Sequence, residues 1–570
     1  MSDHRPTLRD YQREAIQRVL EARRAGVRRM VVALPTGSGK TVIFSELARL
    51  ARRPVLVLAH RRELVQQARE KLARALGDDS VIAIEQGTTQ AHDEAHVVVA
   101  SIRSLHEDRL ARLLAARDFG LIVYDECHHA AAEDNLRVLR SLGAFDENWD
   151  GTLLGFTATT SRGDGAGLDK VFERIVFRRR LFEMVADGYL APLRGYRIST
   201  AADLVAVTAR AGDFAVDELA EAVDIESRNA LVARSIQELA RDRRTIAFCV
   251  TVNHARNLAR ALNAIGLPCG IVHGDQKLDE RQKTLDDFRK GRLAAVTNVG
   301  VLTEGFDDPG VSCIAMARPT RSDGLYAQCV GRGTRIAPGK VDCLVLDFVD
   351  LSALSLVTLP TLAGLPRELD LEGLALDEAE RTLGQLWDDH PGFEVEPGSI
   401  TLGEIQRRAA AFDPLALKVD DEVCAVSANR WESLGSRGLA LHVCWTAQAA
   451  RKGNLSLVLV LDTAGQPGVR KGGKRWRVTL DGKEVSRFSR LEEAVEAVDY
   501  EVHRKGRAVE ATARPNASWR DEPVPDELRR RLEALSPPQR AERFGEAMRL
   551  WVFATEGPRR GRLTASASVS

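Results

Sequence analysis

The chain contains the stretch Met30-Val31-Val32-Ala33-Leu34-Pro35-Thr36-Gly37-Ser38-Gly39-Lys40-Thr41, which decides the start of its fold. The apolar half predicts a buried strand, and the glycine-rich half leads into a helical pattern. Glycines in such a turn let backbone N–H groups approach phosphates at a helix N-terminus, while Lys40 can reach the β and γ phosphates and the Thr41 hydroxyl can bind Mg²⁺. The alternative, a glycine turn without a ligand, is disfavoured by the flanking strand and helix. We therefore expect a nucleotide site built from Thr36, Gly37, Ser38, Gly39, Lys40 and Thr41.

Strand-sized apolar runs recur along the following 300 residues. A first group lies at residues 55–58, 97–100, 121–124 and 152–156, and a second group at residues 245–249, 270–272, 294–297, 312–316 and 343–346. Because each run is continuously apolar and helix-like segments separate the runs, they predict parallel strands covered by helices on both faces. The sequence therefore predicts an α/β fold with two tandem doubly wound parallel-sheet domains, residues 1–205 and 206–350.

The remainder of the chain has a different pattern. Residues 351–420 are acidic, rich in leucine and broken by Pro and Gly, which predicts a helical linker. Residues 421–570 are moderately basic. They contain strand patterns at 439–443, 455–461 and 476–480, an amphipathic helix at 491–503 and a polar tail at 561–570 that we expect to be disordered. The sequence thus predicts a small α+β accessory module.

Two features of this module bear on ligand binding. Residues 470–477 are basic and lie between two strand patterns, which predicts a hairpin tip. Its Lys and Arg side chains could neutralise phosphates while Trp476 stacks on a base, or the tip could be solvated with Trp476 in the core. Both readings stay open. Trp519 is expected to be a packing anchor.

Bulk composition excludes several classes of protein. The 81 Lys and Arg residues balance 81 Asp and Glu residues, so net charge points to no polyanionic partner. The eight cysteines form no C-x-x-C pair, which predicts a reduced intracellular protein without structural zinc. No apolar stretch approaches the roughly 18 residues of a membrane span. We expect a cytoplasmic protein without a membrane partner.

A second cluster with catalytic chemistry follows the strand pattern at residues 121–124, where the chain continues as Asp125-Glu126-Cys127-His128-His129. At the end of a strand, one carboxylate (Asp125) can hold Mg²⁺ while the other (Glu126) orients and deprotonates an attacking water. Zinc binding by the Cys-His-His run is the alternative, but consecutive residues seldom converge on one ion. We favour His128 as a polar link between the nucleotide and the second domain.

The order and spacing of these motifs over residues 8–350 resemble superfamily 2 DEAD/DEAH-type helicases, in the branch of the XPB-like and type III restriction enzyme (ResIII) motors. The resemblance implies two RecA-like domains, ATP and Mg²⁺ as cofactors and an ATPase that depends on nucleic acid. Residues 8–12 resemble the adenine-reading motif, with Arg9 and Gln12 as nucleotide contacts. Residues 59–64 and 100–105 resemble motifs that contact a nucleic-acid strand, here through His60, Arg61, Arg62 and Ser101. Residues 156–159 resemble motif III, in which Thr157 and Thr159 would link the two sites.

The second domain carries the other half of the resemblance. Residues 303–309 resemble motif V, which implies that Gly305 and Asp307 contact nucleotide and that Thr303 contacts nucleic acid, with Thr297 as a further contact. Residues 328–335 resemble motif VI, with Gln328, Arg332 and Arg335 as catalytic candidates. Arginines three residues apart on one helix face can both point into a cleft and neutralise the transferring phosphoryl group. We therefore expect Arg332 and Arg335 to be arginine fingers.

The leading functional hypothesis is an ATP-dependent DNA helicase or translocase, 3′-to-5′ by resemblance, in repair, recombination or defence. We expect a monomeric, nucleoid-associated motor that prefers DNA to RNA, with repair or defence proteins as candidate partners. The alternatives are an RNA helicase or remodeller, and a defence motor that translocates without unwinding. A protein that uses ATP only as a structural ligand is disfavoured, because Lys40, Asp125, Glu126 and Arg335 are all present.

Overall fold

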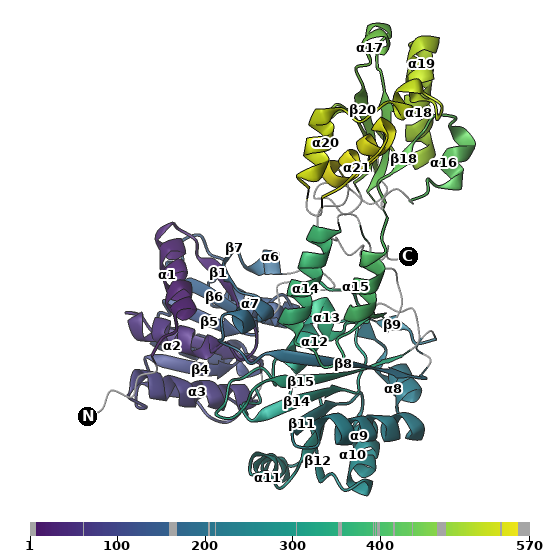
Figure 1. Ribbon diagram of the computed structural model, residues 1–570. Coiled ribbons are helices and arrows are strands. Elements are labelled where there is room, and N and C mark those ends of the chain that lie inside the picture. The colour runs from purple at the N-terminus through teal and green to yellow at the C-terminus, as the bar shows by residue number, and fades with distance from the viewer. Residues whose placement is uncertain are drawn as a thin grey trace. The chain divides into compact units, whose positions relative to one another are not determined.

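The computed structural model describes residues 7–556 except residues 61, 159–167, 203, 205, 211–212, 304, 351–355, 391–392, 394, 396–399, 414–416, 436, 464–474 and 536–537. The chain divides into two compact units, Met1–Glu378 and Ala379–Ser570, each described here by itself (Figure 1). The predicted tail at residues 561–570 and residues 470–474 of the predicted hairpin tip lie outside the described residues.

The first domain is built on a seven-stranded sheet with the order β3-β4-β2-β5-β6-β1-β7, in which every pairing is parallel. Its strands are β1 (Arg29–Ala33), β2 (Val55–Ala59), β3 (Ile82–Glu85), β4 (Val97–Ser101), β5 (Leu121–Asp125), β6 (Thr152–Thr157) and β7 (Arg174–Arg178). Its helices are α1 (Asp10–Arg24), α2 (Lys40–Leu50), α3 (Arg62–Leu76), α4 (Glu107–Ala116), α5 (Glu133–Ser141), α6 (Leu168–Val171) and α7 (Leu181–Ala186).

Alternation along the strands explains why this sheet is covered on both faces. Successive side chains of a strand point to opposite faces. Val32 and Val57 pack with the apolar sides of α1, α2 and α3, whereas Val31 and Leu56 pack with α4 and α5. Because both sets are apolar, the strands read as continuous hydrophobic runs.

The second domain has a six-stranded parallel sheet with the order β12-β13-β11-β14-β15-β8. Its strands are β8 (Leu193–Thr200), β11 (Arg244–Phe248), β12 (Cys269–His273), β13 (Ala295–Val299), β14 (Val311–Met316) and β15 (Cys343–Asp350). Its helices are α8 (Val216–Val223), α9 (Glu226–Ala240), α10 (Val252–Ala264), α11 (Leu278–Arg289) and α12 (Asp323–Val330), and a short ribbon pairs β9 (Ala209–Arg210) with β10 (Asp213–Phe214). The two predicted doubly wound sheets are confirmed.

The boundary between the two domains differs from the predicted one. Residues up to 205 were assigned to the first domain, whereas β8 pairs along its whole length with β15 as the edge strand of the second sheet. The sequence around β8 contains charged residues, and its apolar residues are too few to assign the strand to either sheet. Its membership is decided by this pairing, which joins residues about 150 positions apart.

Short helices follow the second sheet. The predicted linker contains α13 (Leu359–Leu362), β16 (Leu369–Asp370), α14 (Leu376–Asp389), β17 (Ile400–Thr401) and α15 (Leu402–Ala410). The Asp347 carboxylate, in the middle of β15, accepts hydrogen bonds from the Tyr326 hydroxyl on α12 and from the Leu359 backbone N–H. This carboxylate therefore fixes α12 and the start of α13 to the second sheet.

The second unit contains an antiparallel sheet of the order β18-β19-β20-β21-β22. Its strands are β18 (Glu432–Ser433), β19 (Gly438–Val443), β20 (Ser456–Asp462), β21 (Trp476–Leu480) and β22 (Lys483–Phe488), and its helices are α16 (Asp421–Val426), α17 (Ala447–Lys452), α18 (Leu491–Arg504), α19 (Arg507–Ala513), α20 (Asp526–Glu533) and α21 (Phe544–Glu556). The three predicted strands and the predicted helix at 491–503 are present. Trp519 is buried and donates its indole N–H to the Thr512 carbonyl, which confirms it as a packing anchor.

Helix length and hydropathy bear on membrane association. Among the described residues, no helix combines the length and the apolar character needed to cross a membrane.

Candidate active site

The glycine-rich loop lies between β1 and α2, as predicted. Gly37 and Gly39 have φ values of 85° and 77°, in the left-handed region that glycine adopts without strain. Lys40 is the first residue of α2, so the loop ends at a helix N-terminus whose backbone N–H groups are available to a phosphate. Thr36, Gly37, Gly39, Lys40 and Thr41 all line one pocket, and Ser38 is buried behind them.

Gln12 lies directly against this loop. Its side-chain Nε2 donates to the Ser38 carbonyl at 3.3 Å, and its Oε1 accepts from the Arg9 backbone N–H at 3.0 Å. The Tyr11 hydroxyl also donates to the Ser38 carbonyl. Arg9 itself donates to the Tyr189 carbonyl at 3.1 Å. Gln12 thus joins the N-terminal helix to the loop, and its role in reading a base stays a prediction.

The two carboxylates at the end of β5 have different partners. Lys40 Nζ donates to Glu126 Oε1 at 2.9 Å, and Asp125 Oδ1 accepts the Glu126 backbone N–H at 3.1 Å. Burial favours a neutral Glu126, but the charges of Lys40 and His128 outweigh burial and hold its pKa well below the usual range. Burial and the neighbouring Glu126 charge raise the pKa of Asp125 to about 6. Glu126 is therefore the more acidic member of the pair, and Asp125 is the member that binds a proton first as the pH falls.

Glu126 is also held in an unusual backbone conformation. Its φ of 53° and ψ of 52° place a non-glycine residue in the left-handed region, which is uncommon and clusters at functional sites. This conformation turns the chain from β5 into the short helix Cys127–His129. The Glu126 side chain consequently points back to Lys40 rather than along the strand.

Three histidine rings lie in a row next to Glu126. His128 Nδ1 lies 3.4 Å from Glu126 Oε2, the His128 and His129 ring centroids are 4.1 Å apart, and His129 stacks on His60 at 4.8 Å. The row therefore connects the carboxylate that faces Lys40 to the predicted strand contact His60. His129 has no role in the motifs predicted from the sequence, and only the pairing of β2 with β5 reveals its contact with His60.

The second domain supplies the opposite wall of the same pocket. Four residues of the second domain line this pocket: Gly305, Asp307, Arg332 and Arg335. Asp307 Oδ1 lies 2.9 Å from Arg335 Nε, and Asp307 Oδ2 lies 3.2 Å from Lys71 Nζ on α3 of the first domain. Arg335 Nη1 is buried and makes no hydrogen bond. An arginine fixed at Nε with a free Nη group in a pocket is well placed to meet an anion.

The two candidate fingers differ from the prediction. They were expected on one helix face, but α12 ends at Val330, and both arginines lie in the irregular segment that follows. Arg332 donates to the carbonyls of Thr303 at 2.8 Å and Phe306 at 2.9 Å, so much of its guanidinium is used to hold the motif V turn. Arg335 therefore has the geometry of a finger, while Arg332 braces the turn beside it. Gln328 is buried on α12 and does not line the pocket.

Several predicted nucleic-acid contacts are buried. Thr297 is 0% exposed, and its hydroxyl donates to the Ala255 carbonyl at 3.0 Å inside the second domain. That prediction is wrong, because the strand β13 is covered on the face to which Thr297 points. The Thr303 hydroxyl donates to the Gly300 carbonyl at 2.9 Å, and Ser101 is also buried. Thr157, which was predicted to link the ATP site to the nucleic-acid site, is buried as well.

The remaining predicted contacts lie at strand ends or outside the described residues. His60 follows β2, is partly exposed and lies 3.4 Å from Arg103 Nη2, which sequence reasoning had not assigned. Arg62 begins α3, although its side chain is not described. Arg61, a predicted nucleic-acid contact, and Thr159, a predicted link between the two sites, lie outside the described residues.

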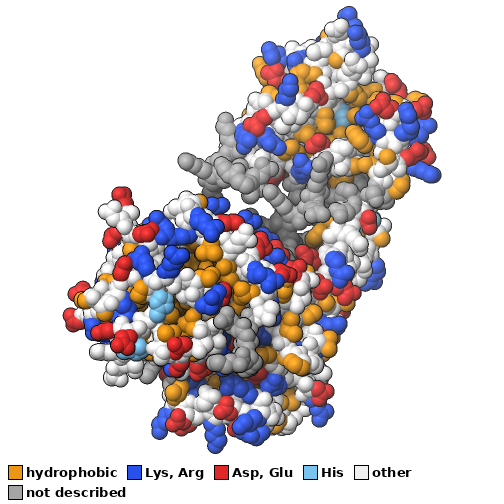
Figure 2. Space-filling model, turned by 90° about the vertical axis from the view of Figure 1, so that its left-hand side faces the viewer, with side chains coloured by type: hydrophobic (Ala, Val, Ile, Leu, Met, Phe, Trp, Pro, Cys, Tyr) orange, Lys and Arg blue, Asp and Glu red, His pale blue; other side chains and the backbone are white. Residues whose placement is uncertain are grey.

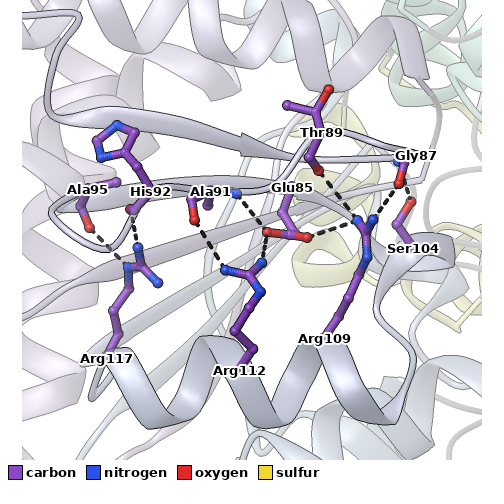
Figure 3. A network of polar contacts seen from close by, with 10 residues as sticks. All are labelled: Glu85, Gly87, Thr89, Ala91, His92, Ala95, Ser104, Arg109, Arg112 and Arg117. Carbon is purple, nitrogen blue, oxygen red and sulfur yellow. Dashed lines mark hydrogen bonds and ion pairs between the residues drawn. The ribbon is translucent and has the colours of Figure 1, made fainter.

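A dense polar network supports this edge of the first sheet (Figure 3). Glu85 ends β3, is 0% exposed and pairs with Arg109 and Arg112 of α4. Together with Arg117 these arginines donate to five backbone carbonyls of the β3–β4 connection, those of Gly87, Thr89, Ala91, His92 and Ala95. Gly87 in turn donates its N–H to the Ser104 hydroxyl at 3.2 Å. The network therefore fixes the turn after β3 to the segment after β4.

The described side chains on one face of the molecule show no single dominant charged patch (Figure 2). On the face drawn in Figure 2, described Lys and Arg side chains are interspersed with Asp and Glu. This agrees with the balanced composition of the chain. Attraction of a nucleic acid to this face would therefore depend on local clusters of basic side chains rather than on a net field.

Comparison with known proteins supports the assignment of both domains. Residues 5–162 match the family model "Type III restriction enzyme, res subunit", and residues 227–337 match "Helicase conserved C-terminal domain". A relative from Schizosaccharomyces pombe named as a mitochondrial ATP-dependent helicase, irc3, is 32% identical over 480 residues, covering 81% of this chain and 75% of the relative.

Two further relatives are more distant. The Escherichia coli type I restriction enzyme EcoAI endonuclease subunit is 28% identical over 60% of this chain and 46% of its own length. A Haloarcula marismortui protein named as a DNA 3′-5′ helicase, Rad25, is 26% identical over 55% of this chain and 48% of its own length. The Schizosaccharomyces pombe relative matches most of both chains, and the two domain matches and the pocket between Lys40 and Arg335 agree with it. The chain therefore belongs to the ResIII-type helicases of superfamily 2 and is an ATP-hydrolysing helicase.

Proposed function

We propose that the chain is an ATP-dependent DNA helicase or translocase that binds ATP between its two α/β domains. The DNA strand would lie at the carboxyl ends of the parallel β-strands, and the protein would move along it in the 3′-to-5′ direction. The observation that carries the proposal is the shared pocket. Lys40 and Glu126 line it from the first domain, and Asp307 and Arg335 line it from the second. Opening and closing of such a pocket changes the relative position of the two domains with each hydrolysis cycle.

Each pocket residue has a role that follows from its geometry. Lys40 and the loop N–H groups would hold the β and γ phosphates, and Arg335 Nη1 would meet the γ-phosphoryl group. Glu126 would orient and deprotonate the attacking water, because it is ionised and lines the pocket beside the loop. In this role Glu126 must exchange its contact with Lys40 for the water when phosphates engage Lys40.

The residues also fit a magnesium ion. Asp125 and the Thr41 hydroxyl line the same pocket, and hard oxygen ligands of this type suit Mg²⁺ when phosphate oxygens and waters complete the shell. Burial and the neighbouring Glu126 charge raise the pKa of Asp125, and the Lys40 charge offsets only part of this rise. Bound Mg²⁺ would supply additional positive charge and neutralise charge on the phosphates.

DNA is favoured over RNA by the names of two relatives. One is a restriction enzyme endonuclease subunit, and the other is named as a DNA 3′-5′ helicase. A more distant relative, 23% identical, is named as a DEAD-box ATP-dependent RNA helicase. The choice of DNA therefore needs a direct comparison of polymers.

The test is an ATPase titration of the full chain with single-stranded DNA, duplex DNA and single-stranded RNA of one length. We expect single-stranded DNA to raise the hydrolysis rate most, with Lys40→Ala as the inactive control. Greater stimulation by RNA would reverse the DNA assignment, and no stimulation by any polymer would contradict the proposal.

Strand displacement on a duplex with a 3′ overhang, compared with a 5′ overhang, tests the direction. We expect displacement from the 3′ overhang. Stimulated hydrolysis without displacement on either substrate would favour the second candidate, a restriction-type motor that translocates without unwinding, which the endonuclease-subunit relative supports.

A further inference from the structure

Lys71 is a residue of the pocket that none of the matched motifs contains. It lies on α3, and its side chain is 40% exposed, so burial does not explain its position. Its Nζ lies 3.2 Å from Asp307 Oδ2, across the cleft between the two domains. The other oxygen of the same carboxylate holds Arg335 Nε at 2.9 Å. One carboxylate thus joins a cation of the first domain to the candidate finger of the second.

α3 presents a continuous face to the second domain. Leu64, Gln67, Ala68 and Lys71 all line the pocket, and their spacing places them on one side of a helix. A Cβ on Gly305 would lie 3.0 Å from Leu64 Cδ2, so the motif V turn already lies against this face. The contact between α3 and motif V is therefore a packed surface with the ion pair at one end.

An adjacent face of α3 fixes Lys71 to the first domain. Val65 and Leu72 are fully buried in the core beneath the first sheet. Consequently Lys71 cannot follow the second domain when the domains separate. Asp307 keeps both partners only while the cleft is closed.

We propose that Lys71 is a positioning residue for ATP hydrolysis: from the first domain it holds the Asp307 carboxylate, which orients the Arg335 guanidinium toward the pocket. Arg335 Nη1, which makes no hydrogen bond, is the group that this arrangement leaves for the γ-phosphoryl oxygen. The inference rests on the proposed role of Arg335. Charge-assisted bonds of this kind are stronger and more directional than neutral ones.

The placement of Lys71 also suggests what engages it. α3 begins at Arg62, next to the predicted strand contact His60, and Lys71 lies nine residues further along, roughly 14 Å at 1.5 Å per residue. A nucleic acid bound at the start of α3 would shift or stabilise the whole helix as a rigid element. Lys71 would transmit this change to Asp307. A substitution of Lys71 should therefore change the ATP hydrolysis rate measured at saturating DNA.

The test compares Lys71→Met, which removes the charge and keeps the stem, with Arg74→Met one turn further along the same helix. Arg74 is exposed, and no ion pair is recorded for it among the described residues. At saturating ATP and single-stranded DNA, we expect Lys71→Met to lower kcat about tenfold or more with little change in the KM for ATP. Lys71→Arg should restore most of the rate, and Arg74→Met should match the wild type.

A double-mutant cycle separates positioning from other roles. In an Asp307→Asn background, Lys71→Met should cause no further loss, because its partner is gone. A full additional loss would overturn the inference, as would an unchanged kcat. A raised KM with normal kcat would show that Lys71 binds nucleotide itself, which also overturns it.

Arg335→Ala, measured in parallel, keeps the two proposals distinguishable. If Arg335→Ala hydrolyses ATP at the wild-type rate, the proposed function of the pocket fails whatever Lys71 does. If Arg335→Ala is inactive and Lys71→Met is normal, only the inference about Lys71 fails. Equal thermal unfolding of Lys71→Met and wild type would exclude a folding defect.

Discussion

The two walls of the pocket differ in where their charges find partners. In the first domain, Lys40 and Glu126 pair with each other at 2.9 Å within that domain. In the second domain, Asp307 pairs with Arg335 and also with Lys71 of the opposite domain. The first wall is therefore complete within its own domain, whereas the second is complete only when the domains meet. The difference predicts that nucleotide binding depends mainly on the first wall and hydrolysis on both.

The largest expected effect comes from the second wall. Arg335→Ala should lower the ATPase rate at saturating DNA by about 10³- to 10⁵-fold, as loss of an arginine finger does. Binding of a fluorescent, non-hydrolysable ATP analogue should change only a few-fold, since Lys40 and the loop remain. Loss of binding in parallel with loss of hydrolysis would show that the two walls do not divide these tasks.

Within the first wall, Glu126→Gln should lower the hydrolysis rate by about 10²- to 10⁴-fold through loss of the general base. The amide can still accept a hydrogen bond from Lys40, so analogue binding should be retained. The measurement is single-turnover hydrolysis with excess protein. A rate within tenfold of the wild type would assign the base to another residue.

Replacement of Glu85 tests whether ion pairs within the first domain also stabilise the ends of its strands. Glu85→Ala leaves Arg109 and Arg112 without the buried carboxylate between them, which should destabilise the first domain by about 3–5 kcal/mol. Hydrogen exchange of the β3 and β4 amides would report this loss. Glu94→Ala, in the same connection but exposed, should change stability by less than about 0.5 kcal/mol.

The smallest effect concerns Asp347, which anchors α12 before the finger segment. Burial raises its pKa to about 6 from 3.8, so the folded state binds a proton that the unfolded state releases. The resulting stabilisation is full below about pH 4 and is lost as the pH rises to about 6. Relative to wild type, Asp347→Asn should therefore gain roughly 2–3 kcal/mol of stability between pH 4 and pH 7. Parallel pH profiles of both proteins would contradict this assignment.

The sequence predicted most of the first wall because its chemistry is local. Continuous apolar runs predicted strands β1, β2, β4, β5 and β6. Residues 36–41 come shortly after β1, and residues 125–126 lie at the end of β5. Parallel strands end at one edge of a sheet, so residues that follow them meet there. Lys40 and Glu126 accordingly lie together although 86 positions separate them.

The parts that the sequence did not reveal depend on long-range packing. Lys71 meets Asp307 over 236 positions, and nothing in the spacing of α3 distinguishes it from a solvated lysine. Thr297 resembles any polar residue at a strand end until the Ala255 carbonyl on α10 is placed beside it. Helix α12 ends at Val330, so Arg332 and Arg335 do not share one helix face. The irregular segment after the helix packs against the motif V turn, which gives the two arginines different partners.

The most direct test of the split pocket is the factor by which saturating single-stranded DNA stimulates hydrolysis, measured for wild type and Arg335→Ala at saturating ATP. If nucleic acid acts by bringing the second wall to the first, the wild type should be stimulated at least about tenfold and Arg335→Ala hardly at all. An equal stimulation factor in both proteins would contradict the account, because DNA would then act without Arg335.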